Sequence, residues 1–422
     1  MEIIRTVNYI ISVTFFICCS YQFFYVIVPF IWKNKSNKTA RLHKYAVLIA
    51  ARNEETVISQ LIKSIKNQTY PSELIKIFVV ADNCTDNTAL KARLAGATVW
   101  ERFNSRKVGK GYALEFLLDK INKKYPKNTF DGYFVFDADN LLDENYISEM
   151  NKVFSAGNKI ITSYRNSKNF GDNWVSAGFS LWFLRESQYL NRSRYLLGTS
   201  CAVSGTGFLF HRDILEKTRG WKFHLLTEDI EFTIHHVIEG EKIAYCESAV
   251  LYDEQPVKFG QSWDQRMRWA KGYIQVFKKY GFSLFETLFK KRSFSCFDMI
   301  MNTMPAIVLS VLSSLINICY AVYRMLLHQS AIYLMEAAGK SLLCMYLMFF
   351  IIGCITTVTE WKRIYCGTLK KCLYTLTFPV FMFTSIPISV IALFSKVEWK
   401  QIYHSESKTL DDVRNIAKQF TA

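Results

Sequence analysis

The chain has 422 residues, of which 50% are hydrophobic and 21% are charged, and its formal net charge is +16. This mixture suits neither a plain soluble enzyme nor a transporter with many spans, and it predicts a soluble domain joined to a few membrane segments. The charge fits anionic lipid headgroups or phosphate-bearing substrates. Because no zinc-finger spacing, RNP-like aromatic pattern or basic heptad region accompanies it, we expect no nucleic-acid partner. None of the eleven cysteines forms a CxxC pair, so we expect reduced, buried thiols.

Residues 1–32 are predicted to form an N-terminal transmembrane helix. The run from Val7 to Trp32 is almost uncharged and long enough to cross a ~30 Å hydrocarbon core. It lacks the short apolar centre and cleavage site of a signal peptide. Since the positive-inside rule counts basic residues, the segment after this helix is expected in the cytoplasm. The basic residues that follow the helix are Lys33, Lys35, Lys38, Arg41 and Lys44.

Residues 45–292 are predicted to form a folded α/β domain. Short apolar runs indicate buried strands, and the stretch Glu55–Lys66 carries its apolar residues on one helical face. Strands that alternate with helices favour βαβ units and a mostly parallel sheet, whose ligands gather at the carboxyl ends of the strands. The predicted strands are Ala46–Ala50, Ile75–Val80, Thr98–Arg102 and Tyr133–Asp137.

Acidic residues stand at the ends of three of these strands. Glu54 follows the first strand, Asp82 follows the second, and the fourth closes with Asp137-Ala138-Asp139. Burying such acids is costly without a ligand or metal, so the clustering favours a site. Two carboxylates one residue apart can hold Mg²⁺ or Mn²⁺ together with a diphosphate, because hard cations prefer oxygen ligands. The alternatives are a solvated turn for the triplet and helix capping for Asp86.

A loop that contains Lys110 precedes the next predicted helix. Glycines and cations beside a helix start favour phosphate binding, and a solvated basic loop is the alternative. The residues of this loop are Arg106, Lys107, Gly109, Lys110 and Gly111.

The sequence Leu226-Thr227-Glu228-Asp229 precedes a further helix-like stretch. Thr227 fits an N-cap, with the two acids placed favourably in the first helical turn. The functional alternative is a general base for a sugar hydroxyl, which requires hydrogen-bonding reach of the acceptor. The residues alone favour the cap.

Gln265-Arg266-Met267-Arg268-Trp269 lies within a predicted amphipathic helix, residues 261–280, at the membrane surface. An arginine there suits a diphosphate because its fork bonds two oxygens at once. The tryptophan offers a flat face for a sugar ring.

Residues 301–394 contain three more apolar segments, and residues 395–422 form a polar tail. Four full spans would put both chain ends outside, whereas the lysines of the tail argue for a cytoplasmic end. Either the last segment, which Pro379 and Pro387 interrupt, is re-entrant or interfacial, or the rule fails here. The three segments run from about Met301 to Tyr323, Ser341 to Val358 and Leu373 to Phe394.

These motifs together resemble glycosyltransferase family 2, in particular its membrane-bound branch with cellulose, chitin, hyaluronan and poly-N-acetylglucosamine synthases. The similar span runs from about Ala46 to Tyr273, and the four motifs occur in the family's order. They are Asp82, Asp137-Ala138-Asp139, Thr227-Glu228-Asp229 and the QxxRW pattern Gln265–Trp269.

The resemblance implies a GT-A fold and a nucleoside-diphosphate sugar donor, usually UDP-linked. It implies that Asp229 is the catalytic base, with Glu228 as the next candidate, and that Asp139 binds metal and diphosphate. The resemblance also implies four donor-binding residues. Asp82 is expected to bind the nucleobase of the donor, and the others are Lys110, Asp137 and Arg268, with Asp137 also near the metal. The expected acceptor and lid residues are Gly205, Thr206, Gln265 and Trp269.

The expected activity is inverting transfer to a growing polysaccharide, with export as a possible accompaniment. The alternative is transfer of one sugar to a membrane lipid, because QxxRW also occurs in such relatives. A transporter or anchored binding module without chemistry is the competing class. We expect a multi-pass protein of the cell membrane with its catalytic domain in the cytoplasm, in contact with membrane lipids.

Overall fold

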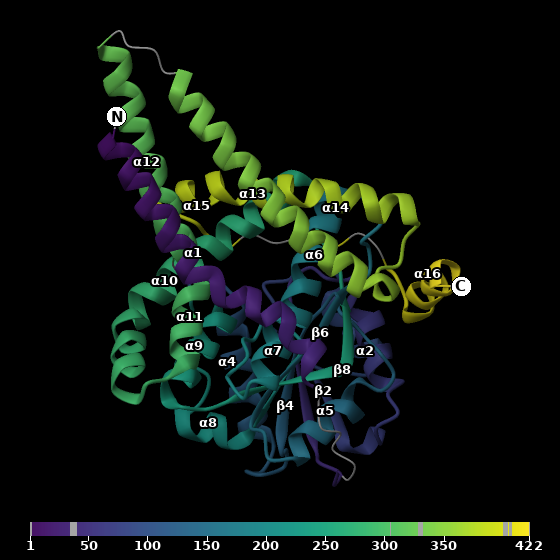
Figure 1. Cartoon of the computed structure of the whole chain (residues 1–422). Helices are drawn as coiled ribbons and strands as arrows, with labels where there is room; N and C mark the ends of the chain where they lie inside the picture. Colours follow the sequence, from purple (N-terminus) through teal and green to yellow (C-terminus); the bar gives the residue numbers. More distant parts are fainter. Residues whose placement is uncertain are drawn as a thin grey trace.

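A computed structural model describes residues 2–33, 40–303, 305–327, 332–399, 404 and 407–421. Lys35 and Lys38, used above to orient the first helix, lie outside these ranges. The described chain forms a sheet domain, from which α1 (Glu2–Ile31), α12 (Pro305–Leu326) and α13 (Ile332–Thr359) project together (Figure 1).

Eight strands form one mixed sheet within the described ranges, in the order β3-β2-β1-β4-β7-β6-β8-β5. The pairs β1–β2, β2–β3, β1–β4 and β6–β8 are parallel, and β4–β7, β6–β7 and β5–β8 are antiparallel. The predicted α/β fold is confirmed. The sheet, which was expected to be mostly parallel, contains four parallel and three antiparallel strand pairs within the described ranges. The strands are β1 (Tyr45–Ala51), β2 (Ile75–Asp82), β3 (Thr98–Arg102), β4 (Gly132–Asp137), β5 (Leu141–Leu142), β6 (Ile160–Ser167), β7 (Phe208–His211) and β8 (Ile243–Asp253).

Helices cover both faces of the sheet because the buried strands alternate apolar side chains to either side. Leu48 of β1 contributes to the core beneath α4, and Ile49 contributes to the core beneath α2. The helices of the domain are α2 (Ile58–Lys66), α3 (Thr88–Leu94), α4 (Lys110–Lys124), α5 (Tyr146–Ser155), α6 (Trp174–Arg185), α7 (Arg192–Leu196), α8 (Arg212–Thr218), α9 (Glu228–Glu239), α10 (Phe259–Lys291) and α11 (Phe294–Thr303), with short turns η1 (Ser72–Leu74) and η2 (Glu186–Asn191).

Strand direction brings the chemically active segments to one edge. Ala50 of β1 is in register with Asp137, and Ser167 of β6 is in register with Asp253. β7 runs against both β4 and β6, so its start meets their ends. The carboxyl ends of β1, β2, β4, β6 and β8 therefore share an edge with the loop that precedes β7.

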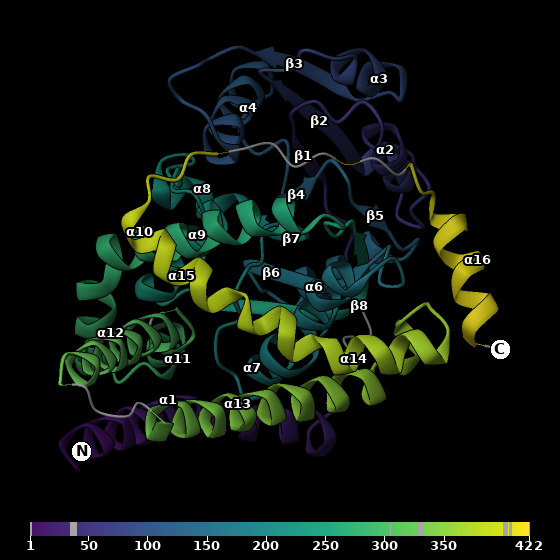
Figure 2. The ribbon, with the colours of Figure 1, turned by 90° about the horizontal axis from the view of Figure 1, so that it is seen from above.

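Three helical stretches in the described ranges are long and apolar enough to cross a membrane: Thr6–Ile31, Gly339–Thr359 and Thr368–Phe394. Leu315–Leu326 is a shorter apolar helix. The last stretch divides at Thr384 into α14 (Thr368–Phe383) and α15 (Ser385–Phe394). These two helices lie across the top of the sheet domain, whereas the start of α1, the end of α12 and the start of α13 extend beyond it (Figures 1 and 2). A short turn, η3 (Trp361–Arg363), precedes α14.

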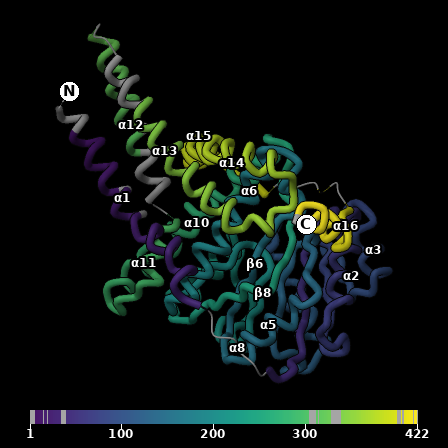
Figure 3. The backbone as a smooth tube through the Cα atoms, turned by 45° about the vertical axis from the view of Figure 1, so that its right-hand side comes forward, coloured from purple at the N-terminus to yellow at the C-terminus, as the bar shows by residue number. Residues whose placement is uncertain are grey.

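The predicted polar tail packs on the sheet domain and ends in a helix, α16 (Leu410–Thr421). Figure 3 shows α16 beside the sheet domain, away from the projecting helices. An Arg414 nitrogen lies 2.5 Å from Oε1 of Glu144, and Val413 is buried against Leu141 of β5. The tail and the sheet domain are thus in direct contact.

Candidate active site

A cavity of about 210 Å³ opens at the shared sheet edge. Acids, cations and aromatic rings from distant parts of the sequence line it. The sequence-predicted residues on its wall are Asp82, Lys110, Asp137, Asp139, Gly205, Glu228, Asp229, Gln265, Arg268 and Trp269. Thr206 stands just behind the wall, where its Oγ1 accepts a hydrogen bond of 2.9 Å from the Asp137 backbone N–H.

Lys110 joins the sheet edge to the start of α9. It begins α4 after Gly109, whose φ of +135° favours glycine. Its ammonium donates to Oδ1 of Asp137 at 2.5 Å and to the Gly205 carbonyl at 2.7 Å, and it lies 3.9 Å from Glu228. Although burial opposes the charge, Asp137 and Glu228 raise the pKa of Lys110. The lysine is therefore a fixed cation inside the cavity.

The two acids at the start of α9 lie in an environment that penalises their negative charge. Burial raises the pKa of Glu228, against the opposing effect of Lys110. Burial also raises the pKa of Asp229, against backbone N–H groups that include those of Ile230 and Gly205. A carboxyl group whose pKa is raised above its ordinary value is better suited to accept a proton than an ordinary carboxylate.

Thr227 occupies the N-cap position of α9, but its side chain makes no capping hydrogen bond. Its Oγ1 is buried without a hydrogen-bond partner among the described residues. A Cβ on Gly272 of α10 would stand only 2.5 Å from this oxygen, so the threonine packs tightly against that helix. The prediction that the Thr227 side chain caps α9 is therefore wrong. The Thr227 side chain packs against α10 instead.

Asp82 is buried and paired. Nη1 of Arg102, from β3, lies 2.5 Å from its Oδ1, and Nη2 of the same arginine donates to the Lys107 carbonyl at 2.6 Å. Burial raises the pKa of Asp82, and Arg102 opposes this effect. The ion pair fixes the loop before α4 against the end of β2.

The QxxRW segment lies on α10, where Gln265, Arg268 and Trp269 face the cavity. Oε1 of Gln265 and Nε of Arg268 are buried with no hydrogen-bond partner among the residues that the structure describes. Burial lowers the pKa of Arg268. Buried polar atoms without partners are costly, which points to a ligand that supplies hydrogen-bonding groups here.

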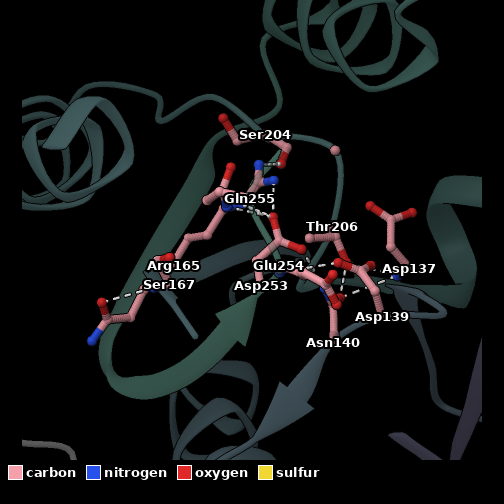
Figure 4. A network of polar contacts seen from close by, with 12 residues as sticks. Asp137, Asp139, Asn140, Arg165, Ser167, Ser204, Thr206, Asp253, Glu254 and Gln255 are labelled. Carbon is pink, nitrogen blue, oxygen red and sulfur yellow. Dashed lines mark hydrogen bonds and ion pairs between the residues drawn. The ribbon is translucent and has the colours of Figure 1, made fainter. Parts of the chain in front are cut away.

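A polar network surrounds the carboxyl end of β8 (Figure 4). Asp253 accepts from Nε of Arg165 at 2.9 Å and from the Asn140 side chain at 3.1 Å. The next residue, Glu254, donates its backbone N–H to Oδ2 of Asp139 at 3.1 Å. Burial raises the pKa of Asp253 to about 6. This network fixes Asp139 at the wall of the cavity.

The family model for glycosyltransferase like family 2 matches residues 43–272. The chain belongs to this family. The matched span contains all four motifs and every cavity residue named above, so the site is the part of the molecule that the family shares.

Three curated relatives of this family member are similar over part of their lengths. "Probable glycosyltransferase YdaM" of Bacillus subtilis is 28% identical over 61% of this chain and 61% of its own. Beta-monoglucosyldiacylglycerol synthase of Nostoc sp. is 27% identical over 56% of this chain and 50% of its own. Poly-beta-1,6-N-acetyl-D-glucosamine synthase of Staphylococcus epidermidis is 23% identical over 57% of each chain. The chain thus spans 50–61% of these relatives.

One solved structure is similar to nearly the whole of this chain. It is the mannosyltransferase PcManGT from Pyrobaculum calidifontis in complex with GDP-Man and Mn²⁺, with a TM-score of 0.59 and 12% identity. The likeness covers 92% of this chain and 99% of that one. Together with the family match, it confirms the expected GT-A-like fold.

Several residues that line the cavity were not predicted from the sequence. Arg165 and Asp253 stand at strand ends, the same signal that pointed to Asp82, but their strands were not recognised. Trp399 and His404 reach the cavity from the tail, where no local pattern marks them. The wall residues without an earlier assignment include Trp182, Phe183, Glu186, Glu254 and Tyr273.

Proposed function

We propose that the chain is a membrane-bound inverting glycosyltransferase that takes a nucleotide-sugar donor, UDP-linked by preference. The observation that carries this proposal is the convergence of Lys110, Asp229 and Arg268 on one cavity within the family span. Cations suited to a diphosphate and an acid with a raised pKa are the two parts that such transfer requires.

In the proposed reaction, Asp229 accepts the proton of the acceptor hydroxyl as that oxygen attacks the anomeric carbon. The attack comes from the face opposite the diphosphate, so an α-linked donor gives a β-linked product. Lys110 and Arg268 offset the negative charge that grows on the leaving diphosphate, the effect that is usually worth most in such reactions. Asp82 would hold the base of the nucleotide, and Gln265 and Trp269 would close over the acceptor.

A divalent cation fits the acidic end of the cavity. Nδ1 of His404 lies 2.9 Å from Glu54, and its Nε2 lies 3.8 Å from Asp139. Although burial opposes it, these carboxylates raise the pKa of His404 to about 10, so the place stabilises positive charge. The described residues contain no group of three metal-binding side chains. In the proposed reaction, Mg²⁺ or Mn²⁺ would be held by Asp139 and Asp137 together with diphosphate oxygens and would offset charge on the leaving group.

The proposed acceptor is a growing polysaccharide, and a membrane lipid is the second candidate. One relative named above is a polysaccharide synthase, and another, with the higher identity, is a glucosyldiacylglycerol synthase. The three candidate spans among the described residues favour the lipid, because a polymer channel built from these helices alone would be narrow.

The contacts of the tail support a topology with the sheet domain and the tail both in the cytoplasm. Arg414 reaches Glu144, and His404 reaches Glu54, so the two parts lie on one side of the membrane. Lys271 of α10 donates to the Ala392 carbonyl of α15 at 3.0 Å. We propose that α1, α12 and α13 cross the membrane and that α14–α15 lies along its cytoplasmic surface. This arrangement removes the conflict between the span count and the basic tail.

The test is a donor screen with the full chain in lipid nanodiscs. We expect release of nucleoside diphosphate from one UDP-sugar, dependent on Mg²⁺ or Mn²⁺ and stopped by excess EDTA. A sizing gel of the labelled product then separates a polymer from a lipid with one sugar. Intact donor after long incubation with every sugar tested, with and without lipid, would contradict the proposal and favour a protein without chemistry.

A further inference from the structure

A π-helical turn interrupts the helix that forms one wall of the cavity. η2 continues α6 directly and passes into α7, and five of its six residues are buried. Glu186 is the exception, because it is partly exposed and lines the cavity. Single π turns inside helices occur frequently at functional sites, where they change the direction of side chains.

Glu186 has the surroundings of a sugar-binding carboxylate. Trp182 and Phe183 stand one helical turn before it, and Tyr273 of α10 lines the same cavity. The Ser204 hydroxyl donates to its Oε1. Within the described ranges this carboxylate forms no ion pair of 4.0 Å or less, and Arg165, which interacts with it electrostatically, is itself paired with Asp253.

The position of Glu186 separates it from the proposed nucleotide end. Asp82 ends strand β2 and Asp139 lies just after strand β4, while Glu186 begins η2, which packs against α1. Arg185, its neighbour, donates to Oε1 of Gln22 on α1 at 2.8 Å. The helix that carries Glu186 therefore contacts α1, from whose side a membrane-linked or growing acceptor would come.

We propose that Glu186, with Trp182 and Ser204, forms an acceptor subsite that binds the hydroxyl groups of an uncharged sugar ring. This proposal rests on the proposed function and adds the class of acceptor to it. An ionised carboxylate only accepts hydrogen bonds, so it suits sugar hydroxyls and repels phosphate or uronate groups. The partly exposed Trp182 ring supplies the apolar face against which a pyranose packs, whereas the Phe183 ring is buried beneath the Arg165 guanidinium.

The carboxylate is expected to control acceptor affinity and selectivity, not donor chemistry. A hydrogen bond to a charged group corresponds to about 10- to 100-fold in affinity. Glu186→Gln keeps the shape of the side chain and removes its charge, and Glu186→Asp keeps the charge on a shorter stem. Glu286→Gln, an exposed glutamate of α10 paired with Lys290, is the matched control.

The experiment compares hexyl β-glucoside with hexyl β-glucuronide as probes for the full chain in nanodiscs. Binding is followed by tryptophan fluorescence without donor, and transfer and acceptor-free nucleotide release are measured with the active UDP-sugar. We expect wild type and Glu286→Gln to prefer the glucoside. Glu186→Gln should raise the KM for the glucoside about 10- to 100-fold. This variant should bind the glucuronide nearly as tightly as it binds the glucoside. Its acceptor-free nucleotide release should stay within about two-fold of wild type. Glu186→Asp should retain the discrimination against the glucuronide.

An unchanged preference for the glucoside in Glu186→Gln would overturn the subsite. So would a loss of nucleotide release equal to the loss of transfer, because that would indicate a structural effect. If wild type binds the glucoside with Glu186-dependent selectivity but releases no nucleotide, the proposed function fails and the sugar subsite stands.

Discussion

Nζ of Lys110 lies 2.5 Å from Oδ1 of Asp137, so the first acid of the Asp-Ala-Asp triplet is paired with a lysine. The same ammonium reaches the Gly205 carbonyl and lies 3.9 Å from Glu228. Lys110 therefore links the proposed donor residues to the acids of α9. A bound diphosphate would compete with Asp137 for this cation.

Replacement of Lys110 should affect both donor binding and transfer. Lys110→Met removes a cation that faces the leaving diphosphate, and the loss of one such group costs about 10²–10³ in rate. We expect that loss in kcat together with weaker UDP binding, measured by initial rates and by calorimetry. Lys124→Met, at the far end of α4, is the control. Transfer within two-fold of wild type would remove Lys110 from the donor site.

A pair of glycines separates backbone strain from disturbance of the site. Gly205 has φ +78°, and a Cβ there would lie within 4.0 Å of Asp229, Arg165 and Asp137. Gly157 has φ +91°, and a Cβ there would meet nothing within 4 Å. Both alanine variants force a residue with a Cβ into the left-handed region, which costs about 1 kcal/mol or more.

We expect Gly157→Ala and Gly205→Ala to lower the melting temperature by similar amounts. Only Gly205→Ala should also lower kcat, by at least about ten-fold, because its methyl group enters the space between the proposed base and Asp137. Thermal unfolding and initial rates measure the two effects. Equal activity in the two variants would show that the loop before β7 does not border the reacting groups.

The buried acids of α9 set the expected pH dependence. Burial raises the pKa of both Glu228 and Asp229 above their ordinary values. A base must be ionised to act, so kcat/KM should fall as the pH drops through the raised pKa, at a higher pH than an ordinary carboxyl would give. A pH–rate profile with a saturating metal ion measures this limb. A profile that stays flat down to about pH 4 would contradict a buried carboxylate base.

Cysteine labelling tests the proposed topology. The basic residues after the first helix predict a cytoplasmic segment around Asn37, but Asn37 itself lies outside the described residues. Leu42, which is 61% exposed, and Ser407 of the tail are suitable instead. We expect single cysteines at both positions to react with an impermeant maleimide only after the cells are opened. Labelling of Ser407→Cys from outside intact cells would place the tail on the far side and break the contacts described here.

Sequence patterns located the first half of the sheet because β1, β2 and β4 are mostly apolar runs, and β3 follows them with Val99 and Trp100. β3 has the predicted bounds, and β1, β2 and β4 extend by one or two residues. β6 was missed because it carries polar side chains in a buried strand. Ser163, for example, donates to the Gly207 carbonyl at 2.8 Å, a partner that only the folded sheet supplies.

The rule that ligands meet at strand ends pointed to Asp82 and the Asp137-Ala138-Asp139 triplet, and Asp82, Asp137 and Asp139 line one cavity. The Thr-Glu-Asp and QxxRW motifs were joined to them only through the family resemblance. What local sequence could not provide was the contribution of distant segments. His404 lies 350 residues beyond Glu54, its ion-pair partner. Likewise, the π turn that directs Glu186 into the cavity has no periodic signal of its own. These contacts depend on tertiary packing, which a single sequence does not encode as a pattern.

The replacement Asp229→Asn tests the central claim most directly, because it keeps size and hydrogen bonding but cannot accept a proton. The measurements are the rate of sugar transfer, the affinity for UDP and the melting temperature. Asp119→Asn, at an exposed position of α4, is the control. An acid whose pKa is raised on folding destabilises the fold above its unfolded pKa, so its removal should leave stability unchanged or increased. The account predicts that transfer falls by about 10²–10⁴ while UDP binding and the melting temperature are retained. Transfer near the wild-type rate would contradict it and make Glu228 the next candidate for the base.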